Sequence, residues 1–289
     1  MKQKNHKYWV ALFVGPALFF ITVYLLYPSI HTTVISFFGK RSETFIGFKN
    51  YIYSFTSHTM LTAFRNNLMW LIFFTMGTVG MGLLMAILSD KIKYEKIVKS
   101  IIFMPMAVSF VGASVVWKFI YNYKPVVSNQ IGLLNQIIVL FGGQPQGWLM
   151  KGPWMNNLAL IFVGIWIWTG FCMVILSASY KGIPNELIEA GRVDGANEWQ
   201  IFYKIIIPSM RSTIIVVSTT MIINVLKIFD IVYVMTNGNY GTEVIANRMY
   251  KEMFQYRNYG RASAIAVVLF LLIIPVIIMN IKRMKGDSN

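Results

Sequence analysis

Residues that could carry out chemistry are sparse in this 289-residue sequence. The three histidines, His6, His31 and His58, are scattered, and the single cysteine, Cys172, lies inside an apolar run. Neither a convergent set of zinc ligands nor an intrachain disulfide is therefore indicated. The phosphate-binding pattern Gly-x-x-x-x-Gly-Lys-Ser/Thr does not occur, so we expect that this chain does not hydrolyse ATP itself. The sequence predicts no catalytic residue, no metal site and no cofactor held by this chain.

Two charged residues, Lys227 and Asp230, lie within an apolar stretch. Their spacing of three positions would place them on one turn of a helix. Acidic groups inside a membrane are typical of ion-driven carriers, so the pair could belong to a proton or sodium relay. The simpler interpretation is a local ion pair near the end of its helix, because a single pair is thin support for a relay.

The composition indicates that most of the chain lies in a membrane. Hydrophobic residues make up 56% of the sequence and charged residues 13%, whereas a soluble domain carries roughly 25% charged residues. A spanning helix needs about 20 apolar residues, and six segments qualify: 9–30, 67–88, 98–121, 155–180, 212–235 and 262–281. We expect an all-α integral membrane protein with six transmembrane helices, forming a single domain over residues 1–289 within the lipid bilayer.

The first apolar segment could also be a signal peptide, because Lys2, Lys4 and Lys7 precede it. A signal peptide has a shorter apolar region, however, and no small-x-small cleavage site follows this one. We expect the segment to be retained as the first spanning helix.

The basic residues set the expected topology. Lys and Arg are concentrated in both chain ends and in the loops 89–98 and 181–211, and are sparser in the loops 31–66, 122–154 and 236–261. The positive-inside rule then predicts that both termini are cytoplasmic and that the last three loops lie outside. Because the net charge of +15 is explained in this way, we do not expect a nucleic-acid partner.

The loop 181–211 has an unusual pattern. Pro184 suits the first turn of a helix, which we expect to continue to about Val193. Asp194 and Gly195 form a turn pair, and a second short helix is expected from about Asn197 to Ile206, where Pro208 would end it. The pattern alone is also compatible with an ordinary amphipathic loop on the membrane surface.

The same loop carries a resemblance to a known family. Glu189-Ala190-Gly191 is followed by Gly195 and then by Ile205 and Pro208. These spacings resemble the EAA loop of ABC-importer permeases across all 20 positions from Glu189 to Pro208. Gly191 stands where the family usually has Ala, and Ile207 stands where it usually has Leu.

Further segments are similar to the sugar-permease branch of this family, in particular to the larger maltose-type or α-glucoside-type subunit. They are residues 27–28, 47–51, 132–135, 148–149, 229–233, 236–238 and 259–264, and the stretch 99–117 looks similar to α-glucoside permeases. After Thr236 many relatives have a Gly-Gly-Pro turn that this chain lacks. The resemblance implies the type I ABC importer permease fold.

The resemblance also implies partners. These are a second permease in a heterodimer, two ATP-binding subunits that hold ATP and Mg, and an extracytoplasmic sugar-binding protein, all at the bacterial cytoplasmic (inner) membrane. In that family the EAA loop docks on the ATPase subunit. The residues implied in coupling are Glu189, Ala190, Gly191, Asp194, Gly195, Ala196, Ile205 and Pro208.

A sugar-lined cavity is implied between the fourth and fifth predicted spans. The corresponding residues recur at helical spacing and are Gly164, Ile167, Trp168, Phe171, Met221, Asn224, Val225 and Ile228. An aromatic face such as that of Trp168 can stack on a pyranose ring, and the Asn224 amide can bond hydroxyl groups. The alternatives are ordinary packing for Trp168 and Phe171 and an interhelical hydrogen bond for Asn224.

Three functional hypotheses follow. The first is a permease subunit of an ATP-driven sugar importer, with an α-glucoside or oligosaccharide as substrate. The second is an ABC permease for a non-sugar solute such as a polyamine or peptide, which uptake competition would distinguish. The third is a standalone ion-coupled carrier or a membrane enzyme, which predicts activity without an ATPase partner.

Overall fold

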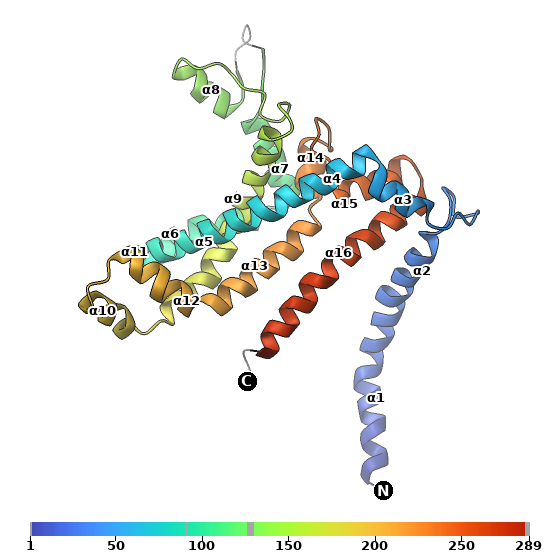
Figure 1. The fold of residues 1–289 in the computed structure, drawn as a ribbon, viewed down its shortest axis with the longest axis horizontal. Helices are drawn as coiled ribbons and strands as arrows, with labels where there is room; N and C mark the ends of the chain where they lie inside the picture. Colours follow the sequence, from blue (N-terminus) through green and yellow to red (C-terminus); the bar gives the residue numbers. More distant parts are fainter. Residues whose placement is uncertain (1, 91, 126–129, 287–289) are drawn as a thin grey trace. The chain divides into compact units, whose positions relative to one another are not determined.

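The computed structural model describes residues 2–90, 92–125 and 130–286, and in this part of the chain the regular secondary structure is helical (Figure 1). No β-strand forms in these ranges, and an isolated bridge joins Phe38 and Phe45. The prediction of an all-α protein is therefore confirmed. The chain divides into two compact units, residues 1–61 with 248–271 and residues 62–247 with 272–289. The unit boundaries fall inside continuous helices, and the expectation of one domain stays a prediction.

The first unit begins with a helix that leaves its surface uncovered. It consists of α1 (Lys2–Ile21), a π-helical turn η1 (Thr22–Leu26) and α2 (Tyr27–Ile35). None of the residues from Leu12 to Ile35 is buried by the rest of this chain. The remaining helices of this unit are α3 (Lys49–Thr56), η5 (Lys251–Gln255) and the first half of α16 (Tyr259–Gly286).

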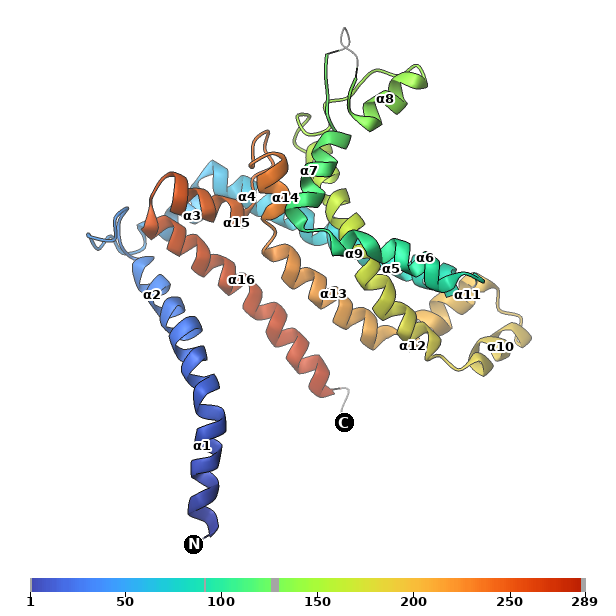
Figure 2. The ribbon, with the colours of Figure 1, turned by 180° about the vertical axis from the view of Figure 1, so that it is seen from behind.

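The second unit holds the other helices. In chain order they are α4 (His58–Met69), η2 (Trp70–Phe74), α5 (Thr75–Asp90), α6 (Glu95–Phe103), η3 (Met104–Ala107), α7 (Phe110–Ile120), α8 (Leu133–Leu140), α9 (Met155–Lys181), α10 (Asn185–Val193), α11 (Glu198–Ile201), η4 (Phe202–Ile206), α12 (Ile207–Ser209), α13 (Arg211–Leu226), α14 (Asp230–Met235) and α15 (Ile245–Tyr250). Helix α15 runs across the unit boundary. Seen from behind, α8 and α10 lie at opposite ends of this unit (Figure 2).

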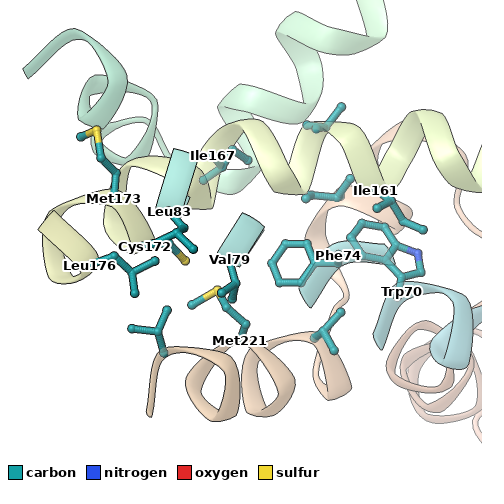
Figure 3. Close-up of a cluster of buried hydrophobic side chains, with 14 of the residues drawn as sticks. Trp70, Phe74, Val79, Leu83, Ile161, Ile167, Cys172, Met173, Leu176 and Met221 are labelled. Atoms are coloured by element: carbon teal, nitrogen blue, oxygen red, sulfur yellow. The ribbon is translucent and has the colours of Figure 1, made fainter. Parts of the chain in front are cut away.

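The core of the second unit lies where α9 packs along α5, with α13 alongside (Figure 3). Trp70 and Phe74 are buried there together with Ile161. Gly82 allows α5 to approach α9 closely, because a Cβ atom at this position would lie 2.5 Å from the Cβ of Cys172. Such contact between small residues is how membrane helices pack without a hydrophobic driving force between them.

Four helices of the described part are long and apolar enough to span a membrane. They are Leu12–Ile35, His58–Asp90, Met155–Lys181 and Tyr259–Ile278, and two bent helix pairs raise the number to six if each pair is one span. The pairs are Glu95–Ala107 with Phe110–Ile120, bent by 99°, and Glu198–Ser209 with Arg211–Leu226, bent by 73°. All six predicted segments therefore correspond to helical stretches.

The prediction of one uninterrupted helix over 98–121 is wrong. The chain becomes a 3₁₀ turn at Met104–Ala107 and is extended at Val108, where ψ is 139°. Ser109 then caps the next helix, because its hydroxyl oxygen accepts a hydrogen bond of 3.1 Å from the Gly112 N–H. Pro105 has no N–H to continue an α-helical ladder, and Ser109 satisfies the new helix start, so the break costs few hydrogen bonds.

Candidate functional site

The first helix of the 181–211 loop, α10, matches the expected bounds and ends in a Schellman motif. The Ala196 N–H donates to the Gly191 carbonyl at 3.0 Å, and the Gly195 N–H donates to the Arg192 carbonyl at 3.1 Å. Gly195 has φ +80°, in the left-handed region that this motif requires. The predicted Asp194-Gly195 turn is therefore confirmed, with a defined geometry.

The second helix of the loop begins with a capping box. The Asn197 side chain accepts from the Gln200 N–H at 2.8 Å, and the Gln200 side chain accepts from the Asn197 N–H at 2.9 Å. Two of the donors that a helix start leaves unpaired are thereby satisfied within the loop. The Asn-x-x-Gln spacing was visible in the sequence and could have located this helix start more firmly.

The prediction that Pro208 ends this helix near Ile206 is wrong, because helical structure continues to Ser209. The reason is the π turn η4, in which the Ile207 N–H donates to the Phe202 carbonyl. This bond spans five residues instead of four, so the residue that follows cannot form the usual α-helical hydrogen bond. That residue is Pro208, which has no N–H, and so no donor is left unpaired. The bend of 73° follows after Ser209.

The eight residues implied in coupling fall into three groups. Exposed are Glu189, Ala190, Asp194, Gly195 and Pro208; half-buried are Ala196 and Ile205; buried is Gly191. A Cβ atom at Gly191 would lie 2.6 Å from Ile205 Cδ1, so Gly191 lets α10 pack against η4. This contact brings together the two halves of the sequence pattern and gives a reason for Gly at this position.

The loop also exposes apolar side chains that sequence reasoning did not single out. They are Leu187, Val193, Trp199 and Tyr203, which we call the loop patch. Val193 is 87% exposed. Exposed apolar groups gathered on a loop of charged and polar residues are typical of a surface that contacts another protein.

Ion pairs connect the start of the loop to neighbouring helices. Lys181 at the end of α9 lies 3.3 Å from Asp90 of α5 and 2.6 Å from Glu95 of α6. Lys99 of α6 bonds both Glu95 and Ser177 of α9. Apart from the Lys99–Glu95 pair, which is four positions apart on α6, these contacts join residues about 80 to 90 positions apart, so no local pattern could have indicated them. They tie the loop to three helices at once.

On α9, the implied sugar-lining residues differ in burial. Gly164 and Ile167 are buried, and a Cβ atom at Gly164 would lie 3.0 Å from both Trp70 and Phe74. Trp168 and Phe171 are half-buried. The Trp168 ring stacks on Phe110 of α7, with centroids 6.0 Å apart and planes at 22°, and meets Phe171 edge-on at 5.6 Å.

On α13, the division is similar. Met221 and Val225 are buried in the core, and Met221 projects toward Val79 of α5 (Figure 3). Asn224 is half-buried, and its amide donates to the Thr220 carbonyl of the same helix at 2.9 Å. The amide oxygen and a second amide proton of Asn224 remain for another partner. Ile228 lies half-buried beyond the last turn of α13.

Lys227 and Asp230 do not share a helical turn, contrary to the prediction. Helix α13 ends at Leu226 and α14 begins at Asp230, with Lys227 exposed between them. Among the residues that the structure describes, no ion pair joins the two side chains. The helix is interrupted at Phe229, whose φ of −140° and ψ of −60° are not helical.

Comparison with known proteins identifies this arrangement. The family of binding-protein-dependent transport system inner membrane components matches residues 78–284 of this chain. The chain belongs to this family. It is an ABC importer permease, a membrane-spanning subunit that is itself non-catalytic, and the resemblance seen in the sequence is confirmed.

Two relatives cover almost the whole permease. The osmoprotective compounds uptake permease protein GgtC of Synechocystis sp. is 61% identical over 96% of this chain and 99% of its own length. The α-glucoside transport system permease protein AglF of Rhizobium meliloti is 47% identical over 96% of this chain and 82% of its own length.

A solved structure shares the permease fold. A chain of a bacterial ABC transporter that imports the acidic polysaccharide alginate matches with a TM-score of 0.81, at 22% identity, over 97% of this chain and 98% of that one. The likeness confirms the type I importer permease fold that the sequence predicted.

Proposed function

We propose that this permease is one of two membrane-spanning subunits of an ATP-driven importer of an α-glucoside or a related oligosaccharide. The relatives support a small polar solute, because one takes up osmoprotective compounds and another takes up α-glucosides. The half-buried aromatic and amide groups of α9 and α13 support a solute without net charge, since the implied lining residues include no ionisable side chain.

The observation that carries the proposal is the geometry of the 181–211 loop. Two short helices, joined by a Schellman motif and a capping box, present the loop patch and Glu189 outward. A rigid surface of this kind suits docking into a cleft of an ATP-binding subunit. The ion pairs of Lys181 then transmit a displacement of the loop to α5, α6 and α9.

Energy comes from partners in this proposal. Two ATP-binding subunits bind ATP and Mg and hydrolyse ATP, while this chain holds no cofactor and no metal. Their closure shifts the two permeases between outward-open and inward-open arrangements. The coupling residues named above contribute contact and stiffness rather than chemistry.

Delivery of the solute fits an extracytoplasmic binding protein. A related importer of known structure was solved with alginate pentasaccharide bound to its periplasmic protein. By the distribution of Lys and Arg, both termini of this permease face the cytoplasm of a bacterium, and the loops 31–66, 122–154 and 236–261 receive the binding protein.

Within the path, the eight implied residues divide by burial. Trp168, Phe171, Asn224 and Ile228 are accessible enough to contact solute. Gly164, Ile167, Met221 and Val225 are packed in the core and hold α9 and α13 at the required distance.

Uptake by proteoliposomes tests the proposal. The tagged permease is purified with its copurifying subunits and binding protein, and uptake of radiolabelled maltose, trehalose and sucrose is compared with that of glycine betaine and putrescine. We expect ATP-dependent uptake of at least one glucoside. Uptake confined to betaine would favour a non-sugar osmoprotectant, and transport by the permease alone, without ATP, would refute the importer assignment.

A further inference from the structure

The first unit contains a cavity with an excess of positive charge. It has a volume of about 600 Å³ and is lined by four basic side chains, Lys40, Lys49, Arg248 and Arg261. One carboxylate, that of Glu252, also lines it. Four cations minus one carboxylate leave a net charge of +3 around the cavity.

The Glu252 carboxylate is already used within the protein. Its side chain is 1% exposed, and it accepts hydrogen bonds from Arg248 at 2.6 Å and from the Tyr53 hydroxyl at 3.0 Å. Burial, and then the adjacent carboxylate, raise the pKa of the Tyr53 phenol, so the phenol stays protonated and remains a donor. Glu252 therefore neutralises Arg248 and is not available to the other three cations.

Arg261 is held in place without a carboxylate. Its guanidinium lies 4.0 Å from the centre of the Tyr53 ring, within the range of a cation–π contact. Across the described ranges of the chain, no carboxylate lies at ion-pair distance from Arg261, Lys40 or Lys49. Three cations around one cavity thus have no counter-ion from the residues that the structure describes.

The walls of the cavity are fixed by backbone contacts. The Asn50 amide donates to the carbonyls of Ser36 at 2.8 Å and Phe38 at 2.7 Å, and the Tyr259 N–H donates to the Lys40 carbonyl at 2.9 Å. A Cβ atom at Gly260 would lie 1.9 Å from the Phe38 carbonyl oxygen, so only glycine fits at this close approach. A preformed site loses little conformational entropy on binding.

The start of α16 adds to the positive potential. Asn258, which lines the cavity, caps this helix: its side chain accepts from the Arg261 N–H at 3.1 Å and its carbonyl from the Ala262 N–H at 3.0 Å. The positive end of a 28-residue helix therefore points toward the cavity.

An apolar groove begins a short way down the same helix. It has a volume of about 490 Å³ and is lined by residues 24–25, 28–30 and 32–34 of η1 and α2 and by Ala266, Val267 and Phe270 of α16. Ala266 is five residues beyond Arg261, which is about 7.5 Å along the helix axis and about 140° around it, so the groove opens on another face of α16. On the side of α2 the two sites are connected by the chain, because Lys40 of the cavity follows six residues after Val34 of the groove. Both helices belong to candidate membrane spans.

We propose that the first unit binds one anionic phospholipid, with its phosphate in the basic cavity and an acyl chain in the groove between α2 and α16. The charge of the cavity complements a phosphodiester, and the groove suits an acyl chain because it is lined mainly by apolar side chains of two candidate membrane spans. A soluble anion would account for the cavity but not for the groove beside it. None of the eight residues implied in the solute path lines this cavity or the groove.

The test is lipid titration of the purified full-length permease, with its copurifying subunits, monitored by native mass spectrometry. Dioleoylphosphatidylglycerol is compared with dioleoylphosphatidylcholine. The variant Lys40→Gln/Lys49→Gln removes two cations of the cavity. Because both residues are exposed, we expect the variant to fold normally. Its matched control is Arg41→Gln/Arg257→Gln, which removes two exposed cations of the same unit that do not line the cavity.

We expect one tightly bound phosphatidylglycerol whose affinity falls about 10- to 30-fold in the cavity variant and stays unchanged in the control. Ala266→Trp, which fills the groove, should lower the affinity for phosphatidylglycerol and leave the charge of the cavity unchanged. An equal loss of phosphatidylglycerol affinity in the two double variants would show that only the general surface charge matters, and would overturn the proposal.

Two further outcomes would assign the cavity to another ligand. Competition by millimolar inorganic phosphate, with no effect of Ala266→Trp, would make it a site for a soluble anion. Unchanged phosphatidylglycerol affinity in the cavity variant, combined with lost binding of the extracytoplasmic binding protein, would make it a protein contact. Either result contradicts a lipid site.

Discussion

At the scale of single residues, Gly195 is the clearest example of a position whose backbone decides its identity. Its φ of +80° is the left-handed conformation that closes the Schellman motif, and a Cβ atom there would meet nothing within 4 Å. Space is therefore available for a small side chain, provided that the side chain tolerates this backbone. Asn and Asp both do so more readily than other residues, and they differ in charge.

This difference gives a matched pair of variants. Gly195→Asn should retain most of the uptake, because the turn is kept and no charge is added. Gly195→Asp should lower uptake at least about tenfold, because a negative charge would enter the docking surface beside Glu189 and Asp194. Expression and membrane insertion, measured by immunoblot, serve as the control. Equal uptake by the two variants would contradict docking through this turn.

Trp168 offers a second residue-scale prediction. The ring packs on Phe110 and Phe171 but remains half-buried, so part of it is accessible, and we expect that part to contact the sugar. Trp168→Ala should raise the sugar concentration needed for half-maximal stimulation of ATP hydrolysis about 2- to 10-fold, which corresponds to the loss of one aromatic contact. Hydrolysis without sugar should change little.

The control for Trp168 is Phe162→Ala, at an exposed position of the same helix that is not among the implied lining residues. It should leave both rates unchanged. If Trp168→Ala lowered basal and sugar-stimulated hydrolysis by the same factor, the side chain would have a packing role only.

At the scale of elements, α10 is a short helix with one face committed to the protein and another left open. Gly191 packs against Ile205, while Leu187 and Val193 are exposed. Val193→Asp should therefore release the ATP-binding subunits, because an interface that buries this position would have to desolvate a carboxylate. We expect at least about a tenfold lower ratio of copurified ATPase to permease.

Phe141→Asp is the matched control. Phe141 is 85% exposed, against 87% for Val193, and it follows α8 at the opposite end of the second unit. Its replacement should leave the copurified ATPase unchanged. Loss of the ATPase from both variants would indicate a general effect of surface charge rather than docking on α10.

At the scale of the whole molecule, some features could be predicted from sequence and others could not. Apolar runs located all six helical stretches, because hydropathy reports directly on the solvent. It averages over windows, however, and so passed over the breaks at Ser109 and Lys227. The ion pairs of Lys181 and the close approach of Gly170 to the Ile102 carbonyl depend on tertiary contacts that local patterns do not contain.

The candidate site was predictable to a similar extent. The sequence pattern of the EAA-like loop located both loop helices, since capping and turn preferences are local. The coupling role of its residues stays a prediction. Helical periodicity grouped the residues of α9 and α13 on shared faces, but it could not tell which of them the core would bury. Ile167 and Met221 are packed inside, whereas Trp168 and Asn224 remain accessible.

The joint between α10 and α11 has a consequence for how quickly the importer assembles. A Schellman motif and a capping box satisfy its backbone donors and acceptors from within the loop itself. The loop therefore keeps its shape in the free subunit, and it loses little conformational entropy when it binds a partner. Association should proceed as the collision of two preformed surfaces, without the slow phase and the large heat-capacity change of coupled folding.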